Sequence, residues 1–514
     1  MLGEGRPGAV DTQDVLGAPA TRRDRVYLEP GVWRDPVAWT IAALVFGAYF
    51  AISLFRYLRL APASWDLGIY TEYVKQLSLL RAPIVDVRGS GFNLLGDHFQ
   101  IGLAVLAPFF RLFPSPVTLL FFQALLTALS VFPVMAAGSA LLGRPSGRLI
   151  GFAYGFSWGL QQMIDFDFHE IALAVPLLAF SLSALVRGRV RATALWALPL
   201  VFLKEDQGFT VAAIGALLVF DGVRALADGP AGPGRRGSIG WGSLLFCWGL
   251  AWSVLAITVI IPHFNPLHEY YYWKDGGVVG ANHGLSAGAL VVQTASGWPV
   301  KLQTVVLLLL PTAFAALGSP IALIALPSLA LRFVSTNSAY WGTEFHYNAT
   351  LTPILFIAAI EALARWRAAD SVRDRAGGRW ASLRGGLAKH GAAMMAAVAV
   401  ALAFQFPLSG LWHGSTYTIS PQVAADNAAM AVVPDGATVL TTLNLLAPLA
   451  ARTDTFWIGN AGNPLTQYIV FDGKNSGYSP APANVPAFIR QLYPTGGYRQ
   501  VFSRGDVYVF RRST

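Results

Sequence analysis

The sequence predicts an all-α polytopic membrane protein of about eleven transmembrane helices, followed by a small α/β domain. The 514-residue chain is 54% hydrophobic and only 13% charged, with a mean hydropathy of +0.50, whereas soluble proteins are usually about 25% charged. Several long stretches, among them residues 117 to 142, carry no charge, and apolar runs of about 18 or more residues are typical of membrane spans. Basic residues gather in short segments between these runs, as they do in cytoplasmic loops.

The apolar runs define a membrane domain over residues 37–408. We expect its eleven spans at residues 37–58, 117–142, 149–164, 170–186, 192–203, 208–221, 241–262, 302–317, 320–334, 348–364 and 391–408. The run from His98 to Phe113 is short, so we expect a juxtamembrane or partly inserted helix there. The spans at 192–203 and 208–221 are also short, and one helix broken at mid-depth is the alternative, because irregular backbone is tolerated where it lines a cavity.

The basic residues set the expected orientation. With the N-terminus inside, residues 1–36 form a cytoplasmic tail, and the cytoplasmic segments together carry 20 of the 37 Lys and Arg residues. This bias is the one that the positive-inside rule describes. Arg56 and Arg59 are exceptions at the outer end of the first span, although long side chains can reach the interface.

The chain changes character after Leu408. Gly, Pro, Asn and Asp become frequent, and short β-rich runs appear at 437–442 and 500–510. We therefore expect residues 409–514 to form an α/β domain. After an odd number of crossings this domain and the C-terminus lie outside the cell.

Composition also excludes some functions. The formal charge of +9 is explained by the cytoplasmic loops, and no basic stretch is interleaved with aromatics, so we expect no nucleic-acid partner. The single cysteine, Cys247, lies in an apolar run, which excludes an intramolecular disulfide framework and a thiolate metal site.

The polar candidates share the expected outer side, where seven of the eight histidines also fall. Ionisable groups at a membrane boundary are costly and indicate function by default, usually with a partner nearby. The candidate residues are Asp66, Tyr70, Asp97, His98, Asp167, His169, Glu170, Lys204, Glu205, Asp206, Arg332, His346 and Tyr347.

Structural explanations stay open for some of them. Asp66 with Tyr70 fits the cap and first turn of an interfacial helix. The run 204–206 could be a self-neutralising cluster that lets the backbone turn. His346 with Tyr347, like the aromatic run 270–273, fits an interfacial aromatic belt.

Several motifs carry a family resemblance. Trp65-Asp66-Leu67-Gly68-Ile69-Tyr70, and Gly96-Asp97-His98 leading into an apolar helix, resemble the N-terminal half of the GT-C superfamily of polyprenyl-phosphate-sugar-dependent glycosyltransferases. Phe166-Asp167-Phe168-His169-Glu170 and Lys204-Glu205-Asp206-Gln207-Gly208 are similar to a family of membrane proteins related to that superfamily. The closer resemblance covers residues 60 to 365.

The resemblance implies an inverting glycosyltransferase of the cell envelope, in a bacterial plasma membrane. Its partners would be the bilayer, a polyprenyl-phosphate-linked sugar and a glycan, lipid or protein acceptor. Asp66 would be the base or acceptor-orienting group, with Asp97, His98 and Asp167 as further catalytic candidates. Lys204 or Arg332 would hold the donor phosphate. Many superfamily members have an acidic or His-Pro motif where Asp97 and His98 stand, but here Phe99 follows the histidine.

Other functions fit the same residues. In a transporter or lipid flippase the carboxylates would bind protons or substrate, although such folds are commonly built from repeats and none is evident in this sequence. A scaffold that binds a partner through its C-terminal domain is a further alternative. No cofactor is required by the sequence. A divalent metal ion stays open, because His169 with Asp165 and Asp167, or His263 with His268 and Glu269, could supply ligands without a specific metal spacing.

Overall fold

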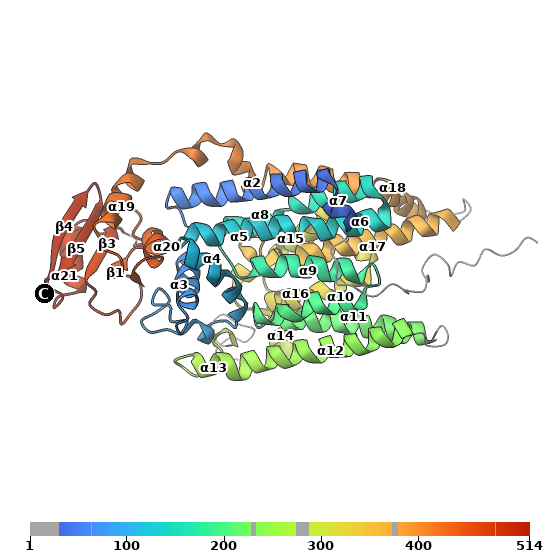
Figure 1. Ribbon diagram of the computed structural model, residues 1–514, viewed down its shortest axis with the longest axis horizontal. Helices are drawn as coiled ribbons and strands as arrows, with labels where there is room; N and C mark the ends of the chain where they lie inside the picture. Colours follow the sequence, from blue (N-terminus) through green and yellow to red (C-terminus); the bar gives the residue numbers. More distant parts are fainter. Residues whose placement is uncertain are drawn as a thin grey trace, which may run out of the picture.

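The computed structural model describes residues 30–62, 64–227, 233–273, 287–372, 379–478 and 480–513. An elongated bundle of helices carries a small sheet domain at one end (Figure 1). The helices of the bundle are α1 (Pro30–Trp33), α2 (Pro36–Leu58), α3 (Asp66–Ser78), α4 (Ala107–Leu112), α5 (Pro116–Leu129), α6 (Val131–Leu142), α7 (Arg144–Gly155), α8 (Trp158–Asp165), α9 (Ile171–Leu185), α10 (Val190–Ala197), α11 (Gln207–Ala227), α12 (Pro233–Leu255), α13 (Ile261–Phe264), α14 (Ala287–Ala295), α15 (Trp298–Leu309), α16 (Leu326–Val334), α17 (Leu351–Val372) and α18 (Arg379–Ala403).

The described residues contain six helices that are long and apolar enough to cross a membrane, judged by length and composition. They are 36–58, 116–142, 207–225, 236–264, 346–369 and 382–403. Shorter apolar helices lie at 101–112, 171–185, 190–202, 298–312 and 320–334. The expectation of a helical membrane protein is confirmed, while the count of eleven crossings stays a prediction.

Two of the expected spans are interrupted. The run 149–164 is two helices, α7 and α8, which meet at Phe156 and Ser157. The helical run that starts within 302–317 ends at Thr312, and the next two residues, Ala313 and Phe314, have φ of 49° and 59°. Left-handed backbone at two consecutive non-glycine residues cannot continue a right-handed helix. Hydropathy alone did not reveal either break.

Residues 190–227 form a hairpin, so the alternative of one broken helix is wrong. Contacts with α12 show the reversal: Ser253 donates to the carbonyl of Glu205 (2.6 Å), and Trp248 donates to the carbonyl of Leu198 (3.1 Å). A Cβ at Gly215 would lie 2.5 Å from the carbonyl oxygen of Gly242. Both arms therefore run along α12 away from Glu205, and the turn at 203–206 lies at one end.

Small residues let α11 and α12 approach closely. A Cβ added at Gly208 would lie 2.3 Å from the carbonyl oxygen of Gly249, and one added at Gly249 would lie 2.2 Å from that of Gly208. Backbones come this close in membrane bundles where glycine and other small residues line the interface. The contact fixes the helix that begins immediately after Lys204, Glu205 and Asp206.

The C-terminal domain is a five-stranded mixed sheet in the order β2-β1-β3-β5-β4. Its elements are α19 (Pro421–Ala431), β1 (Thr438–Thr441), α20 (Leu446–Ala450), β2 (Asp454–Trp457), β3 (Tyr468–Asp472), α21 (Val485–Leu492), β4 (Tyr498–Arg504) and β5 (Val507–Arg512). Strand β1 is parallel to β2 and β3, while β3-β5-β4 is antiparallel, with a register shift between Gln500 and Phe502. The expected sheet is confirmed.

Alternation along the strands buries both faces of this sheet. Val439 and Val470 pack with residues of α19 and α20 on one face, whereas Leu440 and Ile469 pack with residues of α21 on the other. Successive strand residues point to opposite faces, so two layers of helix cover the central strands.

The C-terminal domain contacts α3 directly. A Cβ at Gly68 would lie 3.0 Å from Cβ of Leu446 in α20. The rings of Trp65 and Trp457 meet edge to face at 4.8 Å, and Nζ of Lys75 donates to the carbonyl of Thr453 (2.7 Å). The helix that begins at Asp66 is thus held between the bundle and the C-terminal domain.

Candidate functional site

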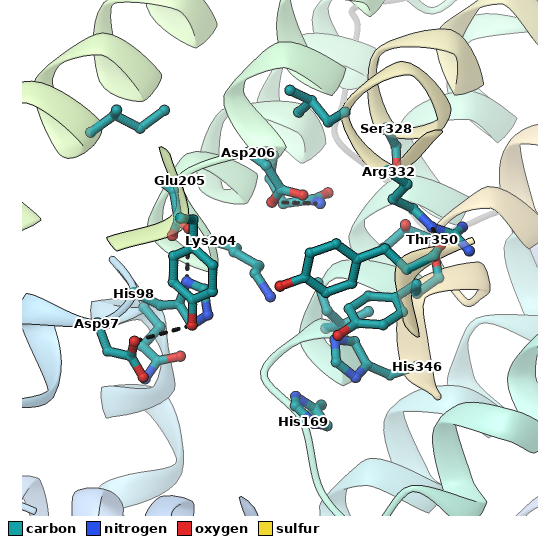
Figure 2. A pocket seen from close by; sticks show the side chains of 18 of the residues that line it. Asp97, His98, His169, Lys204, Glu205, Asp206, Ser328, Arg332, His346 and Thr350 are labelled. Carbon is teal, nitrogen blue, oxygen red and sulfur yellow. Dashed lines mark hydrogen bonds and ion pairs between the residues drawn. The ribbon is translucent and has the colours of Figure 1, made fainter. Parts of the chain in front are cut away.

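A cavity of about 540 Å³ lies in the bundle near its junction with the C-terminal domain, within the roughly 300–1,000 Å³ typical of small-molecule sites. Its wall brings together segments that are far apart in the sequence. Polar and aromatic lining residues include Trp65, Asp66, Tyr70, Arg88, Asp97, His98, Gln100, His169, Lys204, Glu205, Asp206, Tyr270, Tyr272, Arg332, Tyr340, His346 and Tyr347. Figure 2 shows Lys204 extending between a group that contains Asp97, His98 and Glu205 and a second group that contains His169 and His346.

Asp66 is the first residue of α3, and its side chain faces the cavity. The hydroxyl of Ser64 donates to its Oδ2, and Nε2 of His169 lies 3.7 Å from the same oxygen. The N-cap position of α3 is Trp65 and not Asp66, so the capping explanation does not account for the carboxylate.

Glu170 is not among the residues that line the cavity, but it contacts three that are, on the same side as Asp66. It is fully buried, accepts a hydrogen bond from the hydroxyl of Tyr70, and lies 3.2 Å from Nζ of Lys204 and 3.3 Å from Nδ1 of His169. A buried carboxylate is tolerable only with such partners. The close ion pair of Lys204 thus runs across the bundle to Glu170, while Asp206 and Glu205 also stabilise its charge. The self-neutralising cluster therefore stays open as a partial explanation.

A second polar group lies on the other side of Lys204. Nδ1 of His98 donates to Glu205 (2.7 Å), which also accepts from the hydroxyl of Tyr270 (3.0 Å). Asp97 accepts from the hydroxyl of Tyr272 (3.1 Å) and lies 3.4 Å from Nε of Arg88. Tyr270 and Tyr272 thus contact carboxylates of the cavity, which an aromatic belt would not require.

Local electrostatics favour the charged form of Asp66 and the protonated forms of two histidines. Burial raises the pKa of Asp66, but its hydrogen bond and charge interaction with His169 outweigh burial and leave the pKa below its usual value. Burial lowers the pKa of His169, but Asp66 and Glu170 outweigh burial and leave that pKa raised. Glu205 raises the pKa of His98 in the same way.

Arg332 holds the loop that carries His346. Its guanidinium donates to the carbonyls of Tyr340 (2.9 Å), Gly342 (3.1 Å) and Tyr347 (3.3 Å), and to Oδ1 of Asn348 (2.9 Å). These acceptors are neutral, so Arg332 lines the cavity as a buried positive charge. Its predicted contact with a donor phosphate competes with this use of its donors and stays a prediction.

The cavity reaches the outer surface of the bundle beside α12. Val254 and Thr258 line the cavity and are also exposed on the outside of this helix. Here the regular α-helix gives way to a π-helical segment, Ala256–Ile260, a local irregularity that is frequent at functional sites. The cavity thus has a lateral opening with apolar edges.

Most of the predicted site residues converge on this cavity, but Asp167 does not. Its carboxylate turns toward Arg56, whose Nε lies 3.5 Å away, and it lines a smaller pocket beside the C-terminal domain. Arg56 also pairs with Asp165, so the basic residue in the last turn of α2 has acidic partners. The backbone of Asp167 has a φ of 61°, a conformation that costs free energy in a non-glycine residue. Its catalytic role stays a prediction.

Sequence reasoning missed several lining residues. Arg88 and Tyr340 were not singled out, yet Arg88 lies beside Asp97 and the ring of Tyr340 meets that of Tyr347 edge to face. The expectation that boundary charges need partners could have pointed to Arg88. No sequence signal distinguishes Tyr340 from other tyrosines.

Neither proposed metal cluster is assembled. In the residues that the structure describes, no group of three or more His, Cys, Asp or Glu side chains lies close enough to hold a metal ion. Asp165 and Asp167 face Arg56, away from the ring of His169.

The fold and the cavity define a class: a polytopic membrane protein whose helical bundle encloses a polar cavity beneath a small mixed-sheet domain. The chain belongs to the family described as "Predicted membrane protein (DUF2079)", whose model matches residues 56–509. This match includes the C-terminal domain, which the resemblance at 60 to 365 left out. Among curated proteins, none matches the chain.

The fold is similar to that of ArnT from Cupriavidus metallidurans. Its structure bound to undecaprenyl phosphate has a TM-score of 0.52 at 14% sequence identity, with 94% of this chain and 98% of that chain covered. Its apo structure gives a TM-score of 0.51 at the same identity, with 92% and 97% covered. The archaeal oligosaccharyltransferase AglB from Archaeoglobus fulgidus, in complex with an inhibitory peptide and a dolichol-phosphate, gives a TM-score of 0.40 at 11% identity, covering 93% and 74%.

Proposed function

We propose that this protein is a membrane glycosyltransferase that transfers a sugar from a polyprenyl-phosphate carrier to an acceptor on the extracytoplasmic face. The observation that carries the proposal is one cavity that combines ionised carboxylates, buried cations and a lateral apolar opening. Its fold resembles that of ArnT, a protein solved in complex with undecaprenyl phosphate. A shared fold by itself is only an analogy for function, so the chemistry of the cavity has to support the proposal.

The donor fits the side of the cavity between Lys204 and α12. A polyprenyl chain could pass into the bilayer beside Val254 and Thr258, because both side chains line the cavity and are exposed on a helix long enough to span. The donor phosphate would then lie near Lys204. Cations placed where charge develops on a leaving phosphate stabilise the transition state.

The acceptor fits the side of the cavity near Asp66. An ionised carboxylate there can orient an acceptor hydroxyl or take its proton, and His169 with Ser64 fixes its position. Tyr270, Tyr272 and Tyr340 line the space between the two substrates, and such rings can pack against a sugar.

The proposal includes the orientation of the chain. Residues 1–36 are cytoplasmic, residues 37–408 form the membrane domain, and residues 409–514 lie outside, as the distribution of Lys and Arg supports. The cavity is lined in part by residues of α3, a helix that lies at the end of the bundle carrying the C-terminal domain (Figure 1), so it would open toward the extracytoplasmic side.

Transfer by the purified protein tests the proposal. The full chain in liposomes is given radiolabelled polyprenyl-phosphate sugars and a panel of glycan, lipid and protein acceptors. We expect label to move from the lipid to an acceptor with the wild type and not with a variant that lacks the Asp66 carboxylate. Movement of intact labelled lipid across the bilayer without sugar transfer would instead favour the flippase alternative.

A further inference from the structure

In the described part of the chain, three Lys or Arg side chains line the cavity, and the protein itself engages two of them. Arg332 donates to three carbonyls and to Oδ1 of Asn348, and Nζ of Lys204 lies 3.2 Å from the buried carboxylate of Glu170. Arg88 is the third. It differs from the other two because the protein uses only a small part of its guanidinium.

The terminal nitrogens of Arg88 are free. Its Nε lies 3.4 Å from Oδ2 of Asp97, whereas neither Nη atom donates a hydrogen bond to any residue that the structure describes. A guanidinium carries its N–H donors in a fixed fork, so the donors on the Nη atoms remain for a ligand. The side chain is 29% exposed and lines the cavity, which places it within reach of a molecule bound there.

Two aromatic rings hold this guanidinium in place. Its Cζ lies 5.3 Å from the ring centre of Trp65 and 5.3 Å from that of Phe92, within the distance at which a cation is attracted to an aromatic face. Asp97, which is labelled in Figure 2, holds the Nε edge. A group that is already ordered loses less conformational freedom when it binds a ligand.

The C-terminal domain supports the same group. Trp65 meets Trp457 edge to face at 4.8 Å, and the side-chain amide of Asn460 donates to the carbonyl of Val87 (3.0 Å), the residue before Arg88. Trp457 is the last residue of β2, and Asn460 follows this strand closely. The position of Arg88 therefore depends on contacts with both the membrane domain and the C-terminal domain.

The free edge of an ordered guanidinium suits one class of ligand group. Its planar fork matches the oxygens of a carboxylate or a phosphate, which it can bind through two parallel hydrogen bonds. Arg88 lies over Trp65, which directly precedes Asp66. An anion bound by Arg88 would thus lie near the part of the cavity where the acceptor fits.

We propose that Arg88 binds an oxyanion, a phosphate or a carboxylate, that belongs to a substrate of this cavity. The inference rests on the proposed function, because it concerns the substrates of the same site. Either substrate can bring such a group: the donor has its carrier phosphate, and the acceptor can carry an acidic group. The position of Arg88 beside Trp65 favours the acceptor.

Equilibrium binding to the purified full chain in nanodiscs of uncharged lipid tests this site without requiring sugar transfer. The acceptor probes are glycans that carry a carboxylate or a phosphate, each compared with its methyl ester. The donor probes are undecaprenyl phosphate and undecaprenol. We expect Arg88→Gln to weaken binding of the acidic glycans at least about tenfold, the equivalent of 1.4 kcal/mol, and to leave binding of their esters unchanged.

Two further variants separate the fork from the charge and from general damage. Arg88→Lys keeps the charge but not the planar fork, so it should recover only part of the lost affinity. Arg81→Gln changes an exposed arginine of the same loop outside the cavity and should bind every probe as wild type does.

Asn460→Ala tests the support from the C-terminal domain. Asn460 is a positioning residue in this proposal, since it contacts the backbone before Arg88 and does not line the cavity. We expect this variant to lower the preference for acidic over esterified glycans, by less than Arg88→Gln does. A defect of folding alone would weaken both kinds of probe alike.

The probe that loses affinity identifies the source of the oxyanion. Loss confined to acidic glycans in Arg88→Gln assigns it to the acceptor, and loss confined to undecaprenyl phosphate, with undecaprenol unchanged, assigns it to the donor. Unchanged binding of every charged probe, or equal weakening of charged and neutral probes, would overturn the proposal. A wild type that binds acidic glycans through Arg88 but transfers no sugar would overturn the proposed function and leave the oxyanion site standing.

Discussion

Nζ of Lys204 lies 3.2 Å from Oε1 of Glu170, a carboxylate that is fully buried. Lys204→Met alone would leave this carboxylate without its cation, and such uncompensated buried charges destabilise folding. We therefore expect the double variant Lys204→Met/Glu170→Gln to fold better than Lys204→Met and still to bind polyprenyl phosphate at least about tenfold more weakly than wild type, a loss of about 1.4 kcal/mol. Thermal unfolding and lipid-binding titrations measure the two effects. Lys389→Ala, an exposed change, is the control, and wild-type affinity in the double variant would remove Lys204 from the phosphate site.

Asp66→Asn keeps the shape of the side chain but removes its charge. We expect transfer to fall by about 10²-fold or more, because misorientation of a reacting group typically costs that much. Binding of the lipid donor should persist, since Lys204 and the apolar opening remain. Initial rates with the purified protein decide this, and Asp435→Asn in an exposed ion pair of the C-terminal domain serves as the matched change. Full activity in Asp66→Asn would exclude both an orienting and a basic role.

Arg332 offers a choice between a structural role and phosphate binding. Its four hydrogen bonds depend on the forked guanidinium, which lysine cannot reproduce. If the main role of Arg332 is to hold the loop that carries His346, Arg332→Lys and Arg332→Met should lower the unfolding temperature alike. Each variant should then lose about 1–3 kcal/mol of stability, because hydrogen-bond acceptors are left unsatisfied. If lysine preserved both stability and lipid binding, the charge alone would matter and the phosphate role would be favoured.

The orientation of the chain is open to labelling. In a Cys247→Ala background, we expect a membrane-impermeant thiol reagent applied to intact cells to label Ser415→Cys and not Ser382→Cys. Ser415 follows α18 on the side of the C-terminal domain, and Ser382 lies near the start of that helix, where basic residues gather. Cell lysis before labelling, which should expose both sites, is the control. Labelling of Ser382→Cys alone in intact cells would reverse the proposed topology.

The C-terminal domain should lose stability as pH rises through neutrality. Burial, followed by the neighbouring Asp472, raises the pKa of Asp426 to about 7, above its value of 3.8 in an unfolded chain. Between these values the folded state binds the extra proton, so stability falls as pH increases. Asp472 is fixed by amide donors from Gln422, Asn444 and Asn475 (2.9, 2.9 and 2.7 Å).

Asp426→Asn should remove this dependence, because the amide cannot ionise. We expect wild type to lose at least about 1.4 kcal/mol relative to Asp426→Asn between pH 5 and pH 8, the equivalent of one pKa unit. Hydrogen exchange of β1 and β3 amides in the full-length protein, corrected for intrinsic rates, measures the difference. Parallel pH curves for the two proteins would contradict a raised pKa of Asp426.

Much of the site could be predicted because charge near a bilayer is expensive. That single rule selected Asp66, His169, Lys204 and His346, although they are far apart in sequence, and all four line one cavity. Pairing was less predictable: nothing in the sequence says that Lys204 meets Glu170 and not Glu205, since that choice depends on how α9 and α11 pack.

The fold was predictable in class but not in detail. Hydropathy located the long helices such as α2 and α12, because apolar length is what a bilayer requires. It did not reveal the break at Ala313 and Phe314, where backbone conformation and not composition ends the helix. It also left the hairpin at 203–206 unresolved, because short apolar runs look alike whether the chain reverses or continues.

The contact of Gly68 with Leu446 links the position of the C-terminal domain to the position of Asp66 at the start of α3. Even a methyl group at position 68 would press on Cβ of Leu446 at 3.0 Å, and Asp66 lies half a helical turn from Gly68. A molecule that tilted the sheet domain would therefore shift the first turn of α3 with it, and a change as small as an ångström is enough to slow a positioned reaction about a hundredfold. Under the proposed function, a displacement of the C-terminal domain would thus change the rate of transfer through its contact with α3.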